Sequence, residues 1–176
     1  MRIERENAIA LVIDYQEKLV PVMERRYKLI QNSSILLAGL NVLGIPMVIT
    51  QQYTRGLGTT VKEITDAVGN EEYVEKISFS AYESVKEKLT GKKFVIVCGI
   101  EAHICVMQTV IDLAAAGYVP VIIEDCISSR KESDKKAAIK RMRSEGAVVA
   151  TYESILFELL KVAGTEESKK IQRLIK

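Results

Sequence analysis

Residues 94–106 read Phe-Val-Ile-Val-Cys-Gly-Ile-Glu-Ala-His-Ile-Cys-Val, and this stretch decides the fold class. Its first four residues are continuously apolar and rich in β-branched side chains, and a tight turn after Gly99 leads into a segment with helical periodicity. A continuous apolar run, unlike an alternating one, is typical of a strand that is covered on both faces in a parallel sheet. The stretch therefore predicts a buried strand that leads directly into a helix.

The same arrangement recurs along the chain. Longer segments with helical periodicity separate four further apolar runs, namely Ile9–Ile13, Pro46–Ile49, Val119–Ile123 and Ala147–Ala150. Strands that alternate with helices imply right-handed crossovers, and hence a doubly wound three-layer α/β/α fold of the Rossmann-like type. No repeat or linker interrupts the pattern, so we expect a single domain over residues 1–176.

Local signals mark several element boundaries. Gly44, Gly117 and Gly146 follow helical segments at the position where a left-handed residue ends a helix. The words Ser80–Glu83 and Ser129–Glu132 match the capping box, in which the first and fourth side chains bind each other's free backbone donors. Both words are expected to open helices, whereas residues 51–60, which lack any period, predict a loop.

Composition argues against several kinds of partner. Lys plus Arg (25) nearly cancel Asp plus Glu (23), so the net charge of +2 gives no electrostatic reason to expect nucleic acid or an anionic membrane. The basic cluster Arg130–Arg143 includes acidic residues at helical spacing and indicates a solvated helix face. No apolar run approaches the roughly 20 residues that span a bilayer, and the first residues lack a signal core, so a cytoplasmic protein is expected.

Three cysteines without paired spacing predict neither a disulfide framework nor a metal site, and we expect no metal and no cofactor. Cys98 lies inside an apolar run and is expected in the core. Cys126, at a strand end, is interpreted as structural. Cys105 either packs as a small hydrophobic residue or acts as a nucleophile.

Chemically useful side chains follow the predicted strand ends, where an open parallel sheet binds ligands. Asp14 is either a helix cap or a general base. Cys105 is placed at a helix start, where the dipole and the free amides favour a thiolate and can hold an oxyanion. Lys76, in an extended segment, would stabilise both anions and lower the pKa of the thiol. Together they supply a nucleophile, a proton acceptor and an orienting charge.

His103 is the only histidine and the obvious rival base for Cys105. The two residues are two positions apart on a helical turn, so their side chains point in different directions. A structural role is therefore favoured for His103.

Three words in this order resemble the isochorismatase-like cysteine hydrolases, the superfamily that includes nicotinamidases and N-carbamoylsarcosine amidases: Ile13–Gln16, Glu75–Tyr82 and Gly99–Val106. The resemblance extends from about Ala8 to the final helix. It implies a six-stranded parallel sheet, a small-molecule substrate and a homo-oligomer whose neighbouring subunits help to close the pocket.

The resemblance also implies roles for individual residues. The family's Asp-Lys-Cys triad maps onto Asp14, Lys76 and Cys105. Its non-proline cis peptide maps onto Ile100–Glu101, and its oxyanion hole maps onto the backbone N–H groups of Glu101 and Cys105. Candidates for the substrate pocket are Gln52, Tyr53, Ser78, Phe79 and Tyr82.

One departure narrows the expected activity. Nicotinamidases of this family carry metal-binding Asp and His residues after the second strand, whereas Gln51–Leu57 contains neither, so zinc-dependent nicotinamidase activity is not expected. Isochorismatase activity itself is not expected either, because enzymes that act on that vinyl ether need not keep the cysteine. The pattern is closer to uncharacterised isochorismatase-domain hydrolases.

The predicted function is cysteine-dependent hydrolysis of a small amide or related carbonyl compound through a thioester. A nucleotide-binding module is disfavoured, because neither G-x-G-x-x-G nor a phosphate-binding G-x-x-x-x-G-K-[ST] occurs. A non-catalytic or redox-sensing protein on the same fold stays open as the alternative, although no C-x-x-C motif supports it.

Overall fold

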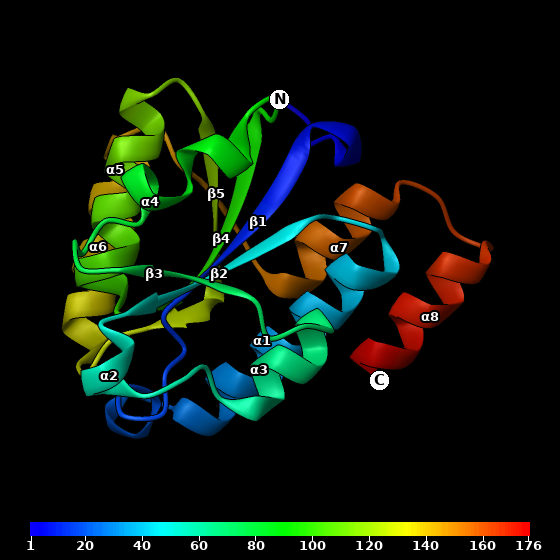
Figure 1. The fold of residues 1–176 in the computed structure, drawn as a ribbon. Helices are drawn as coiled ribbons and strands as arrows, with labels where there is room; N and C mark the ends of the chain where they lie inside the picture. The colour runs from blue at the N-terminus through cyan, green and yellow to red at the C-terminus, as the bar shows by residue number, and fades with distance from the viewer.

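Six strands form one sheet in the order β3-β2-β1-β4-β5-β6, and every neighbouring pair is parallel. The computed structural model describes all of residues 1–176. Figure 1 shows the sheet as the twisted centre of the molecule. The strands are β1 (Ala8–Ile13), β2 (Met47–Gln52), β3 (Tyr73–Lys76), β4 (Phe94–Ile100), β5 (Val119–Ser128) and β6 (Val148–Ala150).

The central strands are buried because both of their faces are apolar. All six residues of β1 are buried, and alternate ones belong to two separate hydrophobic clusters. Ala8, Ala10 and Val12 face one cluster. Ile9, Leu11 and Ile13 face the other. The continuous apolar runs thus correctly predicted strands that are covered on both sides.

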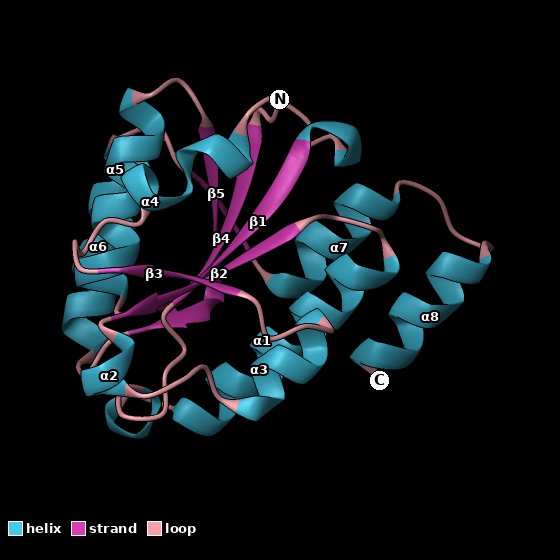
Figure 2. Cartoon of the chain, in the orientation of Figure 1, coloured by secondary structure: helices cyan, strands magenta, loops and turns pink.

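Helices cover both faces of the sheet, which confirms the predicted three-layer α/β/α fold (Figure 2). One layer contains α1 (Arg26–Val42), α3 (Lys62–Val68), α7 (Tyr152–Leu160) and α8 (Glu166–Ile175). The opposite layer contains α4 (Tyr82–Val85), α5 (Met107–Ala115) and α6 (Glu132–Ser144). None of these helices is both long enough and apolar enough to cross a bilayer.

The predicted helix ends are correct, and the two capping words do open helices, since α4 begins at Tyr82 and α6 at Glu132, but neither word forms a capping box. Gly44, Gly117 and Gly146 all have positive φ, at 66°, 86° and 93°. Ala81 and Lys131, which directly precede α4 and α6, make no side-chain cap hydrogen bond, although Ser80 Oγ accepts the Tyr82 N–H at 3.3 Å. Ser129 Oγ is instead bound to His103, and Glu83 pairs with Lys86. The capping box of this chain lies at Thr151–Ser154, where α7 begins.

The loop predicted over residues 51–60 is shorter than expected. β2 continues through Gln52, because Gln51 and Gln52 pair with Glu75 and Lys76 of β3. A single helical turn, α2 (Thr54–Leu57), follows one residue later. Pairing with a distant strand therefore decides where β2 ends, which the local sequence does not show.

Candidate active site

The three predicted catalytic side chains meet at the carboxyl edge of the sheet. Asp14 directly follows β1, Lys76 is the last residue of β3, and Cys105 lies in a π-helical turn after β4. Asp14 Oδ2 is 2.7 Å from Lys76 Nζ, and both side chains are fully buried. Both charges act on the Cys105 thiol. The strand order brings these residues together, because β2 and β4 flank β1 and β3 extends the sheet beyond β2.

Asp14 is held in place by a sharp turn and by its neighbour on β2. Its backbone is left-handed, with φ of 54°, so the chain leaves the sheet immediately after β1. Thr50 Oγ1 donates a 2.8 Å hydrogen bond to Asp14 Oδ1. The sequence argument did not identify Thr50. The available signal was its position near the carboxyl end of β2, two residues before Gln52 and beside Ile13 in the strand register.

Lys76 directs its three N–H donors to three oxygens other than those of Asp14. Its Nζ donates to Gln52 Oε1 at 2.7 Å, to the Phe79 carbonyl at 2.9 Å and to the Ser78 carbonyl at 3.2 Å. An ammonium group has three donors, so the contact with Asp14 is an ion pair without an aligned hydrogen bond. Consistent with this, Asp14 Oδ2 has no aligned hydrogen-bond partner. Oδ2 is therefore free to accept a proton.

Cys105 belongs to the turn Glu101–Val106, which we call the nucleophile turn after the role predicted for Cys105. The backbone N–H groups of Ile104 and Val106 both donate to the Glu101 carbonyl, at 3.1 and 3.2 Å. The Ile100–Glu101 peptide bond is cis. Cys105 itself is only 6% exposed. The turn thus leaves only a small part of Cys105 exposed at the carboxyl edge of the sheet.

A second hydrogen-bonded chain fixes the far side of this turn. Thr109 Oγ1 donates to the Cys105 carbonyl at 2.7 Å and accepts from the Ala81 N–H at 2.9 Å. Thr109 is fully buried. It therefore couples the Cys105 backbone to the start of α4.

The resting thiol is neutral, which corrects the expectation of a stabilised thiolate. Burial raises the pKa of Cys105 to about 12, and the Asp14 carboxylate adds to the rise. The Lys76 ammonium and a hydrogen bond from the Glu101 backbone N–H act in the opposite direction, but the net effect is upward. The sequence argument considered the favourable charges without the burial of the sulfur, which is the larger effect.

The five candidate pocket residues differ in position. Gln52 lies in the site, because it accepts from Lys76 and donates from Nε2 to the Ile77 carbonyl at 2.5 Å. Ser78 and Phe79 reach Lys76 through their carbonyl groups and expose their side chains. Tyr53 is also exposed and packs its ring over Gly56.

The Tyr82 ring contacts a residue at the amino edge of the sheet, which does not favour its prediction as a pocket residue. Its ring contacts that of Tyr118 edge to face, with centroids 6.3 Å apart. Tyr118 directly precedes β5, so it lies at the amino edge of the sheet, opposite the edge at which Asp14 lies.

Gln16 connects several parts of the site, although the sequence predicted no role for it beyond its place in the word Ile13–Gln16. It is fully buried, and its Oε1 accepts from the Gln52 N–H at 2.7 Å. Its Nε2 donates to the carbonyls of Gln52 at 2.9 Å and Gly58 at 2.7 Å. Gln16 thereby ties the end of β2 to the segment after β1.

The positions of the other two cysteines and of the histidine agree with the structural roles predicted for them. Cys98 and Cys126 are fully buried, and burial raises the pKa of each thiol. His103 Nδ1 is 2.9 Å from Ser129 Oγ, so its ring is held by the segment after β5.

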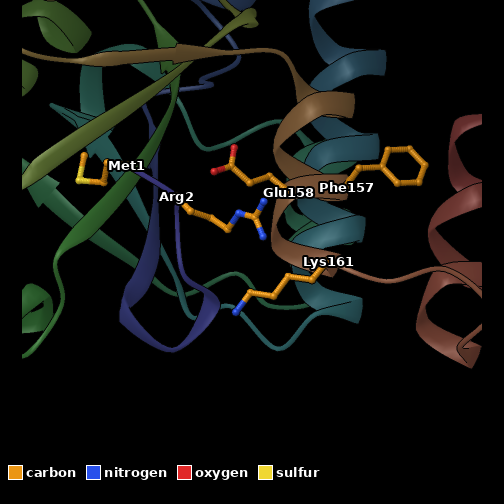
Figure 3. Close-up of a pocket in the computed structure, with 5 residues that line it drawn as sticks. All are labelled: Met1, Arg2, Phe157, Glu158 and Lys161. Atoms are coloured by element: carbon orange, nitrogen blue, oxygen red, sulfur yellow. The ribbon is translucent and has the colours of Figure 1, made fainter.

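A cavity of about 520 Å³ lies away from the site, between the N-terminus and the end of α7 (Figure 3). Met1 and Arg2 precede β1, so this cavity lies at the amino edge of the sheet. It is lined by Met1, Arg2, Phe157, Glu158 and Lys161. No group of three or more His, Cys, Asp or Glu side chains is arranged to hold a metal ion.

The doubly wound parallel sheet, with polar side chains gathered at its carboxyl edge, is the three-layer α/β/α fold of isochorismatase-like proteins. The model of the isochorismatase domain matches residues 8–154. The chain therefore belongs to the isochorismatase family.

Two curated relatives extend the comparison. The chain is 34% identical over 178 residues to isochorismatase domain-containing protein 2A of Mus musculus, covering 99% of this chain and 85% of that protein. It is 36% identical over 167 residues to isochorismatase domain-containing protein 1 of Salmo salar, covering 93% of this chain. The match spans only 59% of the salmon protein's length.

Solved structures have the same architecture. The MAR1 ribonuclease of Caenorhabditis elegans superposes with a TM-score of 0.93 at 32% identity, covering 99% of this chain and 92% of that one. YcaC of Escherichia coli, described as an octameric hydrolase of unknown specificity, gives a TM-score of 0.86 at 23% identity, with coverage of 92% and 83%.

Proposed function

We propose that the protein is a cysteine hydrolase that cleaves a small amide or related carbonyl compound through a thioester on Cys105. The observation that carries the proposal is the buried Asp14–Lys76 ion pair, whose two charges act on the Cys105 thiol. A carboxylate with a free lone pair beside a thiol is an arrangement that supports nucleophilic catalysis.

The reaction begins with proton transfer. Asp14 Oδ2 accepts the proton of the Cys105 thiol while the sulfur attacks the carbonyl carbon of the substrate. Because the negative charge moves from the carboxylate toward the sulfur and the substrate oxygen, the nearby Lys76 ammonium stabilises both the initial and the final arrangement. A neutral resting thiol is therefore compatible with attack, since no isolated thiolate has to form.

The tetrahedral oxyanion is bound by the backbone N–H groups of Glu101 and Cys105, which act in a site that largely excludes water. When the intermediate collapses, the carbon–nitrogen bond breaks and the amine leaves with the proton held by Asp14. Asp14 then takes a proton from water, which attacks the thioester, and Cys105 departs as the thiol after recovering that proton.

A small substrate and an oligomeric protein complete the proposal. Because Cys105 is only 6% exposed, we expect the acyl group that it accepts to be compact. Ile77 and Phe79, which follow the catalytic lysine, are 71% and 54% exposed. Large exposed apolar side chains beside a site mark an interaction surface, and the octameric state of E. coli YcaC supports a homo-oligomer here.

The nematode relative is named a ribonuclease, so RNA cleavage is the competing function. The residues of this site do not favour it. A phosphoryl transition state needs cations aimed at its oxygens. Lys76 is the only buried Lys or Arg, and its donors are already bound to protein oxygens.

Intact-mass measurement after incubation with 4-nitrophenyl acetate and a panel of small amides tests the proposal. We expect an acyl adduct that maps to Cys105, and no adduct or turnover in Cys105→Ala. Cys98→Ala, which removes a fully buried thiol in the adjoining strand, is the matched control and retains turnover. Turnover by Cys105→Ala, or cleavage of a labelled RNA in place of acyl transfer, would overturn the assignment.

A further inference from the structure

An arginine outside the triad binds the residue on which the nucleophile turn begins. Arg130 Nε donates to Glu101 Oε2 and a terminal nitrogen of the same guanidinium donates to Oε1, both at 2.9 Å. Such a bidentate pair fixes orientation as well as distance, because the planar guanidinium matches the planar carboxylate. The Glu101 side chain is 7% exposed and that of Arg130 is 60% exposed, so a nearly buried carboxylate depends on a partner that solvent can reach.

Glu101 controls both ends of the nucleophile turn. Its backbone N–H acts on the Cys105 thiol and lowers the pKa of that group. Its carbonyl accepts the N–H groups of Ile104 and Val106, on either side of Cys105. A shift of Glu101 would therefore move the sulfur and the amide donors together.

The backbone that leads to Arg130 is held in place, because the two residues before it form strand pairing and hydrogen bonds with neighbouring segments. Ser128 pairs with Ile100 in the sheet, and its Oγ donates to the Glu24 carbonyl at 2.8 Å. The Glu24 N–H in turn donates to the Ser129 carbonyl at 3.0 Å. Ser129 is fully buried and also contacts His103 of the nucleophile turn at 2.9 Å.

We propose that Arg130 is a positioning residue for the hydrolytic reaction. By binding the Glu101 carboxylate, it holds the backbone amide donors around Cys105 in place. The Ser129–His103 contact is a second connection between the same two segments. This inference rests on the proposed function, but it concerns a residue that touches neither substrate nor reacting atoms. It predicts an effect on the chemical step rather than on binding.

Arg130→Ala tests the inference with 4-nitrophenyl acetate as the probe. We expect kcat to fall on the order of 10- to 100-fold, because a misplacement of about 1 Å has effects of that size. KM stays within about twofold, since the lost interaction matters in the transition state. Arg130→Lys keeps the charge but not the two parallel hydrogen bonds, and gives an intermediate kcat.

Chemical rescue separates positioning from folding. Removal of the exposed guanidinium leaves a solvent-accessible space beside Glu101, so added guanidinium chloride restores part of kcat in Arg130→Ala, whereas sodium chloride at equal ionic strength does not. Arg141→Ala is the matched control. It removes an arginine of α6 that forms a surface ion pair with Glu145, the residue directly after that helix. It leaves kcat and its response to guanidinium unchanged.

The outcomes distinguish the two proposals. If Arg130→Ala keeps wild-type kcat and KM while Cys105→Ala is inactive, the hydrolase assignment stands and the positioning role is wrong. If Cys105→Ala stays active, the hydrolase assignment itself fails. A loss of kcat in Arg130→Ala that accompanies a lowered melting temperature and is not restored by guanidinium assigns Arg130 to folding alone, and also overturns the inference.

Discussion

Lys76 Nζ and Asp14 Oδ2 lie 2.7 Å apart with neither side chain exposed to solvent. Their charges neutralise each other where water does not reach, so the loss of either partner leaves the other uncompensated in the interior. The stability of the fold and the proposed catalysis therefore depend on the same contact.

Lys76→Met is expected to lower the free energy of unfolding by about 3–5 kcal/mol, because it leaves the buried Asp14 carboxylate without a compensating charge. Urea denaturation followed by circular dichroism measures the change. The double variant Asp14→Asn with Lys76→Met removes both charges and recovers most of the loss.

Lys62→Met is the matched control. Lys62 pairs with Asp66 at 2.6 Å, but the two side chains are 80% and 61% exposed. Removal of such a surface pair changes the free energy of unfolding by less than about 1 kcal/mol. An equal effect of the two lysine variants would contradict the role of burial.

Because Cys105 is neutral, we expect it to react slowly with iodoacetamide. Peptide mapping after timed exposure to the reagent measures the extent of alkylation at Cys105. Because Asp14 contributes to the raised pKa of Cys105, Asp14→Asn lowers that pKa and speeds alkylation at pH 8 by about tenfold or more, while it abolishes hydrolysis. Opposite changes in thiol reactivity and turnover are the expected signature. Slower alkylation in Asp14→Asn would rule out this electrostatic account.

Stability at alkaline pH follows from the same pKa. The folded protein keeps the Cys105 proton to about pH 12, whereas the unfolded chain loses it at lower pH, so the unfolded state binds fewer protons in this window. The stabilisation is complete below the ordinary thiol pKa and is lost as the pH rises toward about 12. The melting temperature therefore falls more steeply with pH in the wild type than in Cys105→Ala. Parallel curves of melting temperature against pH would contradict this.

Thr50→Val removes the hydroxyl that binds Asp14 Oδ1 while it preserves the shape of the side chain. We expect a loss of about 1–3 kcal/mol in the free energy of unfolding, because a buried charge loses a hydrogen bond, together with a lower kcat. Thr65→Val on α3 is the control, since Thr65 Oγ1 only binds the Lys62 carbonyl of its own helix. Unchanged kcat in Thr50→Val would show that Asp14 does not need this partner.

Gly99→Ala probes the close approach of β4 and β1. A Cβ there would lie 2.2 Å from the Ile13 carbonyl oxygen, directly before Asp14, and φ is +139°. We expect a loss of about 1–3 kcal/mol from overpacking, and displacement of Asp14 that lowers turnover. Gly91→Ala, where φ is +79° and no atom lies within 4 Å, retains turnover. Equal kcat in both variants would argue against a role for this contact.

The sequence predicted what local patterns determine. The apolar runs of β1 and β4 identified central strands, because burial on both faces requires continuous hydrophobicity. The residues after those strands identified the edge at which Asp14 and Cys105 lie, because parallel strands end on the same side.

Long-range contacts explain the features that the sequence did not predict. The ends of β2 and β3 depend on their mutual pairing, and the contact of Thr50 with Asp14 depends on that strand register. Ser129 resembles a helix cap locally but is bound by His103. The pKa of Cys105 was predicted in the wrong direction, because burial is a property of the packed chain.

The shielded, protonated sulfur has a consequence for the lifetime of the protein. Peroxides oxidise thiolates at accessible positions, whereas the Cys105 thiol is neutral and Cys105 is only 6% exposed. Oxidation of Cys105 by peroxide is therefore expected to be slow in the folded protein.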